Sequence, residues 1–158
     1  MSELMPLQDA ILARDPGVII VRARSGDRDA GIRAALNGAA CHRTAPGEWI
    51  VICDPAETAA TLAAIRAACG DGAVLAIDIS HGVTALELVG ARGAERLAAY
   101  CDLDPGSERL AKEGAVRTRF GEIGVVIARI DDRPAYLLIA DQSYAEYLAL
   151  LMRHGVAG

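Results

Sequence analysis

Two segments of this chain share one pattern, and this internal repeat limits what the chain can fold into more than any other feature. The sequences GEWIVICDPAETAATLAAIRAACG (47–70) and RPAYLLIADQSYAEYLALLMRHG (133–155) each run from an aromatic residue through aliphatic residues to an aspartate and a helix-forming stretch. Asp54 and Asp141 occupy equivalent positions, an offset of about 87 residues. Each segment follows another strand-helix pattern, VIIVRA…GIRAAL or TALELVG…AERLAAY. The repeat predicts an α+β fold of two small similar lobes, each a mostly antiparallel sheet with helices on one face.

The clearest local signals surround the first aspartate of the repeat. A strand over 48–53 is followed by Asp54 as an N-cap and by Pro55 at the first helical position. Glu57 lies three residues after the cap, the spacing at which two side chains can satisfy free backbone N–H groups reciprocally. Gly70 is expected to end the helix.

The remaining elements follow from periodicity and from turn residues. We expect one helix to be capped by Asp27 and another by Ser143 together with Glu146. The sequence DDRP (131–134) is expected to be a tight turn between antiparallel strands. Further strands are predicted at 17–23, 71–80, 82–90, 115–120, 123–130 and 135–140, further helices at 27–38, 91–101 and 143–155, and a turn-rich connection at 102–114. We expect residues 1–158 to form a single compact unit, with an N-terminal arm (1–16), lobe one at about 17–70 and lobe two at about 71–156.

Composition excludes several classes of function. Aromatic residues make up 4% of the chain, the net charge is −5, and the basic residues are scattered, so nucleic acid is not an expected partner. No apolar run approaches the ~18 residues that a membrane span needs, and the N-terminus does not resemble a secretory signal, which predicts a cytoplasmic protein. The four cysteines form no C-x-x-C pair and are expected to be buried thiols rather than zinc ligands.

The stretch AIDISHG carries three reactive side chains: Asp78, Ser80 and His81. On an extended strand, Asp78 and Ser80 would share a face while His81 pointed away, so the three would not form a nucleophile–base pair. One histidine and one aspartate are also too few ligands for zinc. We therefore favour a structural role at the strand end over catalysis.

The segment GARGAER (90–96) resembles part of a dinucleotide-binding loop but has two of the three glycines. The favoured interpretation is that Gly90 and Gly93 permit a tight turn and close helix packing.

Several motifs together resemble a known family. DISHGVTALELVGARGAERLAAYCDLD is similar to a segment of aminomethyltransferase (glycine-cleavage T-protein) folate-binding domains. Over about residues 6–154 the chain resembles the gamma subunit of heterotetrameric sarcosine oxidase. The resemblance rests on the order of four segments: GVIIVRA, GEWIVICDP, the DISHG segment just quoted, and DQSYAEYLALLM. The resemblance marks as family-motif or interface candidates Trp49, Asp78, Ser80, His81, Gly82, Gly90, Asp102 and Tyr144.

The resemblance implies a non-catalytic structural subunit without catalytic, cofactor-binding or metal residues of its own. The family's complex oxidatively demethylates sarcosine with FAD, FMN and NAD, and passes the one-carbon unit to tetrahydrofolate. These cofactors are expected on the larger alpha and beta flavoprotein subunits, and a small zinc-containing subunit is the remaining partner.

The chain departs from the folate-binding pattern on one strand. Where aminomethyltransferases carry Gly-Gly and paired aspartates, it has FGEIGVVIARI, with Glu122 as the sole carboxylate. Two alternatives stay open: a free-standing folate-binding one-carbon protein, with Asp78, Ser80 or Glu122 near the pterin, and a self-associating module without a ligand.

Overall fold

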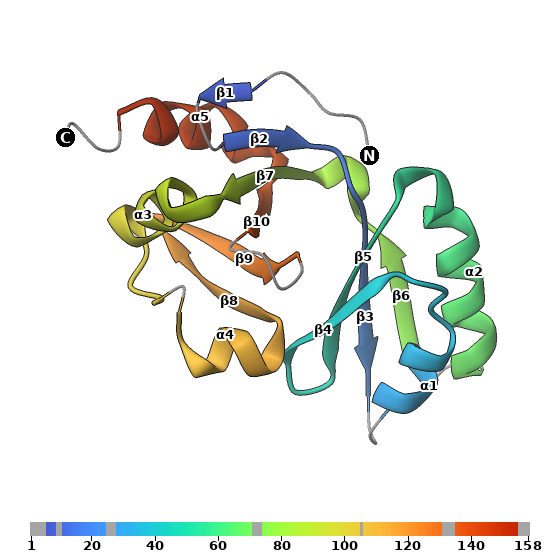
Figure 1. The fold of residues 1–158 in the computed structure, drawn as a ribbon. Helices are drawn as coiled ribbons and strands as arrows, with labels where there is room; N and C mark the ends of the chain where they lie inside the picture. The colour runs from blue at the N-terminus through green and yellow to red at the C-terminus, as the bar shows by residue number, and fades with distance from the viewer. Residues whose placement is uncertain are drawn as a thin grey trace. The chain divides into compact units, whose positions relative to one another are not determined.

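The computed structural model describes residues 6–8, 11–24, 28–70, 74–104, 106–130 and 135–154. These residues form two compact units, each with its own antiparallel sheet (Figure 1). The first unit comprises Pro16–Ser80, and the second comprises the described residues up to Asp15 together with those from His81 onward.

The first unit is a four-stranded sheet with two helices. Its elements are β3 (Gly17–Ala23), α1 (Asp29–Ala34), β4 (Ala40–Ala45), β5 (Glu48–Cys53), the 3-10 turn η1 (Pro55–Glu57), α2 (Thr58–Cys69) and β6 (Val74–Asp78). The strand order is β4-β5-β3-β6, and all pairs are antiparallel. This β-α-β-β-α-β arrangement is the split βαβ, or ferredoxin-like, topology.

The core of the first unit lies between its helices and one face of the sheet. Alternate strand residues point to this face, as the two-residue period of a strand requires. They form one buried cluster with helix residues: Ile19, Val21, Ile32, Cys41, Trp49, Val51, Ile65, Cys69 and Ala76. The opposite face of this sheet carries no helix of the first unit among the described residues.

Helix α1 is attached to the sheet through the single tryptophan of the chain. Trp49 Nε1 donates to Asp29 Oδ1 at 2.9 Å, and Arg33 Nε donates to Asp29 Oδ2 at 2.6 Å. The hydrogen bond from Arg33 is the main cause that lowers the pKa of Asp29, with a further contribution from Trp49. The carboxylate of Asp29 therefore stabilises the contact between α1 and β5.

We expect the first unit to lose stability as the pH falls below 3.8, the ordinary pKa of Asp29. The folded pKa is lowered, so this contribution is present above the unfolded value and is lost as the pH falls through the folded value. Fluorescence of Trp49 during acid titration at fixed urea measures the effect. Asp29→Asn should be less stable at neutral pH and should show a shallower acid dependence. Equal acid dependence of both chains would contradict this role.

The second unit is a six-stranded sheet with three helices. Its elements are β1 (Pro6–Gln8), β2 (Ile11–Arg14), β7 (Val83–Val89), α3 (Gly90–Tyr100), α4 (Glu108–Glu113), β8 (Ala115–Phe120), β9 (Ile123–Arg129), β10 (Ala135–Asp141), the 3-10 turn η3 (Gln142–Tyr144) and α5 (Ala145–His154). The strand order is β1-β2-β7-β10-β9-β8, again fully antiparallel. Its core contains Leu88, Leu97, Phe120, Leu138 and Leu148.

The predicted repeat is present in the structure. In each unit a strand, a 3-10 turn and a helix follow in order, as β5-η1-α2 and as β10-η3-α5. Asp54 Oδ1 accepts from the backbone N–H of Ala56, and Asp141 Oδ1 accepts from that of Ser143, each at 2.9 Å. The backbone bond from Ala56 is the main cause that lowers the pKa of Asp54. The pKa of Asp141 is lowered mainly by the hydrogen bond from the Ser143 hydroxyl, and next by the backbone bond from Ser143. The predicted α+β class with two similar halves is confirmed.

The caps differ from the prediction in detail. Asp141, rather than Ser143, caps the last strand-to-helix turn, because a 3-10 turn precedes α5. At α2 the N-cap position is Glu57, and no side chain makes a capping hydrogen bond there. The expected cap Asp27 and the expected turn 131–134 lie outside the described residues.

Four segments differ from the predicted organisation. Strand β4 lies in a stretch for which no element was predicted. Strand β6 pairs with β3, so the first unit extends to Ser80 rather than ending near residue 70. Two strands of the predicted N-terminal arm join the second sheet, where Ile11 is fully buried. The predicted turn-rich connection 102–114 contains α4, which Ser107 caps by accepting from the N–H of Leu110 at 3.4 Å. That 1–158 form a single compact unit stays a prediction.

Candidate functional site

Asp78, Ser80 and His81 lie where β6 leads into the 3-10 turn η2 (Ser80–Gly82). Asp78 Oδ1 accepts from the backbone N–H of Ser80 at 2.9 Å and from the Ser80 hydroxyl at 2.5 Å. Ser80 Oγ in turn accepts from the backbone N–H of Val18 at 2.9 Å, and His81 is exposed. The two side chains therefore join the end of β6 to the beginning of β3, as the structural interpretation of this stretch predicts.

We expect Ser80→Ala to lower the free energy of unfolding of the first unit by about 1–3 kcal/mol. Val18 is fully buried, so the substitution leaves its N–H without the Ser80 acceptor. Urea titration followed by Trp49 emission measures the change. His81→Ala is the control, because this exposed side chain should change stability by less than about 0.5 kcal/mol. Equal effects of the two substitutions would contradict the assigned role of Ser80.

Trp49 and Gly82 were predicted as family-motif or interface candidates. Trp49 is 1% exposed and belongs to the core of the first unit. The backbone conformation of Gly82 is one that residues other than glycine also adopt, and an added Cβ would meet no atom within 4 Å.

The other three candidates lie in the second unit. Gly90 begins α3 with φ of +69°, in the left-handed region that favours glycine. Asp102 is exposed in the connection after α3, and Tyr144 is 42% exposed in η3.

The glycine pair of GARGAER serves packing. A Cβ on Gly93 would lie 2.5 Å from the carbonyl carbon of Leu88, which shows how closely α3 approaches β7. The interpretation of Gly90 and Gly93 as a turn and a close contact is therefore confirmed.

The carboxylates and hydroxyl considered for the pterin make contacts within the chain. Asp78 and Ser80 are bonded to each other, and Ser80 also bonds Val18. The side chain of Glu122 is 87% exposed and pairs with Arg119 at 3.1 Å, in the turn between β8 and β9.

The cysteines are buried thiols. Cys41, Cys53, Cys69 and Cys101 are all free. Desolvation raises the pKa of Cys41 to about 11, which keeps this thiol protonated near neutral pH. Within the described part of the chain, no three His, Cys, Asp or Glu side chains are grouped as a metal site.

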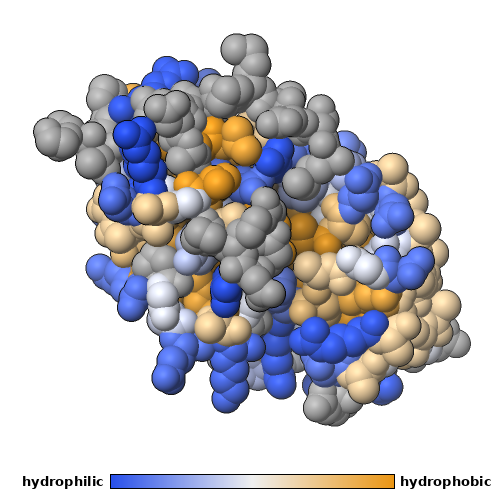
Figure 2. All heavy atoms as spheres, in the orientation of Figure 1, coloured by the Kyte–Doolittle hydropathy of each residue, from blue (hydrophilic) through white to orange (hydrophobic). Residues whose placement is uncertain are grey.

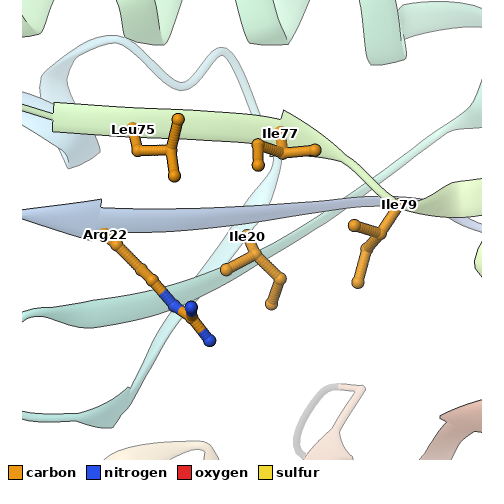
Figure 3. Close-up of a pocket in the computed structure, with 5 residues that line it drawn as sticks. All are labelled: Ile20, Arg22, Leu75, Ile77 and Ile79. Atoms are coloured by element: carbon orange, nitrogen blue, oxygen red, sulfur yellow. The ribbon is translucent and has the colours of Figure 1, made fainter.

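Two surface features were not predicted from the sequence. The face of the first sheet opposite its own helices has an open hollow of about 170 Å³, lined by Ile20, Arg22, Leu75, Ile77 and Ile79 (Figure 3). A hollow of about 500 Å³ lies along α5, lined by Glu146, Tyr147, Ala149, Leu150 and Arg153. The hollow on the first sheet could have been predicted from the sequence VLAIDI, because both faces of this one strand carry apolar residues.

The visible surface is a mixture of hydrophobic and hydrophilic residues (Figure 2). Four large hydrophobic side chains are notably exposed among the described residues: Leu75, Ile77, Tyr144 and Leu150. No helix among those residues is long and apolar enough to cross a membrane.

The fold defines a class of α+β proteins with two antiparallel sheets, each with its own helices. The structure is similar to glycine cleavage system aminomethyltransferase T from Bartonella henselae, with 14% identity and a TM-score of 0.64 over 89% of this chain and 44% of that one. It is also similar to the regulatory subunit of aspartate kinase from Thermus thermophilus, with 14% identity and a TM-score of 0.59 over 94% and 97% of the two chains. At these identities the likeness concerns the fold alone.

The family follows from the sequence. The model of the sarcosine oxidase, gamma subunit family matches residues 31–158, and the chain belongs to this family. Its structure is similar to a chain of heterotetrameric sarcosine oxidase from Corynebacterium sp. U-96 in complex with pyrrole 2-carboxylate, with 19% identity and a TM-score of 0.72 over 99% of this chain and 90% of that one. No curated protein sequence matches the chain.

Proposed function

We propose that this chain is a non-catalytic structural subunit of a heterotetrameric oxidase that acts on sarcosine or a related N-methyl amine. The observation that carries the proposal is the family match over residues 31–158. The similarity to a chain of heterotetrameric sarcosine oxidase, over 99% of this chain, supports it. The proposed partners are larger flavoprotein subunits that hold FAD, FMN, NAD and the tetrahydrofolate site, together with a small zinc-containing subunit.

The chemistry of the candidate residues supports a structural role. The hydroxyl of Ser80 donates to Asp78 and accepts from a backbone N–H, and this turn geometry uses the hydroxyl as a link between two strands. The Cys41 thiol has its pKa raised to about 11, which opposes nucleophilic use. We therefore propose that this chain holds the larger subunits together.

Co-purification tests the proposal. The tagged chain is isolated from its native source, and the eluate is analysed by native mass spectrometry, visible absorption and sarcosine-dependent peroxide formation. We expect larger chains with flavin absorbance and oxidase activity. A chain that elutes alone and colourless would overturn the proposal, and tetrahydrofolate titration of that sample would test the folate-binding alternative.

Asp78→Asn separates a structural role from a catalytic one. Losing a general base typically lowers the rate by about 10²–10⁴-fold. We expect unchanged turnover per flavin in the assembled complex, because the amide oxygen of the substituted side chain remains an acceptor for the Ser80 turn. A loss in the catalytic range, with assembly intact, would show that the chain contributes a catalytic group.

A further inference from the structure

Both edge strands of the first sheet are covered near the middle by an arginine of the same unit. The edges are β4 and β6, because the strand order is β4-β5-β3-β6. Arg33 of α1 donates from Nη1 to the carbonyl of Cys41 on β4 at 2.9 Å. Arg66 of α2 donates from Nη2 to the carbonyl of Ala76 on β6, also at 2.9 Å. Each helix of the unit therefore reaches one edge of the sheet.

The carbonyl of Ala76 is one that an added strand would use. The N–H of Ile79 donates to the carbonyl of Val18 on β3 at 2.9 Å. Backbone groups alternate sides along a strand, so those of Ala76 point away from β3, to the side where β6 has no partner strand among the described residues. Helix α2 lies beside β6 (Figure 1), which brings Arg66 within reach of that side.

The β4 edge carries a second obstruction. Its register with β5 shifts between Arg43 and Ala45, and such an irregularity interrupts the regular series of backbone groups that a partner strand needs. Arg33 is itself held by Asp29, whose Oδ2 accepts from Arg33 Nε at 2.6 Å. The guanidinium therefore joins this carboxylate to the carbonyl of Cys41.

Hydrogen-bond satisfaction alone does not require the two arginines. Both are exposed, and a carbonyl at an exposed edge can bond water instead. What Arg33 and Arg66 add is a bulky cation at the position that the next strand would occupy. Charged side chains and irregular edge strands are common means by which sheets avoid pairing at their edges.

We infer that Arg33 and Arg66 close the two edges of the first sheet against strand pairing with a second copy of this chain, an inference that does not depend on the proposed function. A free edge can pair with the same edge of a second copy about a two-fold axis, which gives a closed dimer. Two free edges on one chain would let pairing continue from copy to copy.

Arg33→Met/Arg66→Met tests the inference in the full chain. Methionine has a helix propensity close to that of arginine but lacks the N–H donors. Sedimentation velocity over a concentration series measures association. We expect the double variant to associate at a concentration at least about tenfold lower than the unchanged chain, and to form species larger than dimers. Arg66→Met alone opens only the β6 edge and should stop at a dimer.

Hydrogen exchange followed by mass spectrometry identifies the contact. The N–H of Ala76 points outward, so pairing through β6 should slow exchange in a peptide that contains Val74–Asp78. The matched control is Arg24→Met/Arg28→Met, which removes two exposed arginines between β3 and α1. Both double variants make the net charge of −5 more negative, which opposes association, so lost charge repulsion cannot explain a gain.

Three results would overturn the inference. The first is a folded Arg66→Met chain, judged by Trp49 emission and thermal melting, that associates no more than the unchanged chain. The second is equal association of the control variant, and the third is association without slower exchange in β4 or β6. Because Arg33 also bonds Asp29, its replacement can loosen α1. If the double variant misfolds, Arg66→Met decides the question at the β6 edge by the same measurements.

Discussion

Replacing Glu87 by alanine should lower the free energy of unfolding of the second unit by about 3 kcal/mol, the lower end of the range for breaking a buried ion pair. Glu87 is 4% exposed on β7, and its carboxylate pairs with the guanidinium of Arg14 on the adjacent strand β2. The side chain of Arg14 is only 12% exposed, so the substitution leaves a poorly solvated cation without this carboxylate. Urea unfolding followed by far-UV circular dichroism measures the loss.

The control for this prediction replaces both partners. Arg14→Met/Glu87→Leu removes both charges and fills much of the same volume, so it should be more stable than Glu87→Ala alone. Trp49, which lies in the first unit, reports separately whether that unit is affected. If the double variant were as unstable as Glu87→Ala, lost packing rather than a buried charge would explain the effect.

The second large effect is expected for Gly93→Ala, which should destabilise the second unit by about 1–3 kcal/mol. The new Cβ would lie 2.5 Å from the carbonyl carbon and 3.0 Å from the oxygen of Leu88. Backbone atoms cannot rotate away as a flexible side chain can, so α3 must move from β7. Thermal melting by circular dichroism measures the change.

Gly31→Ala is the matched control within another helix. Gly31 is exposed in α1, and an added Cβ would meet no atom within 4 Å. Alanine there should be neutral or should stabilise by about 0.4–1 kcal/mol, because it restricts the unfolded chain. Equal losses for Gly31→Ala and Gly93→Ala would mean that close packing on Leu88 is not the cause.

The features predicted correctly depend on residues that are close in sequence. Asp54 and Asp141 each begin a turn by bonding the N–H two residues later, and Gly70 ends α2 with φ of +68°. The same holds for Asp78, whose Oδ1 accepts from the N–H of Ser80 two residues later, because an Asp-x-Ser turn is a local hydrogen-bonding unit. Short-range hydrogen bonds of this kind can be predicted from a few neighbouring residues.

The missed features have different causes. Helix α4 is six residues long, and its signals, Ser107 as the cap and Gly114 with φ of +74°, were outweighed by the turn residues before it. The exposed patch around Leu75 and Ile77 depends on which face of β6 the helices cover, and burial on a face is a property of packing rather than of the strand sequence.

The sequence alone determined the α+β class, the two related halves, most strands and helices, and the family, because periodicity, caps and motif order are local or sequential properties. Only the tertiary structure decided that β6 pairs with β3, that the N-terminal strands complete the second sheet, and that Arg14 meets Glu87. Strand pairing joins residues far apart in the chain, and any apolar strand can satisfy the same backbone hydrogen bonds. The choice among partners is made by the packing of the whole unit.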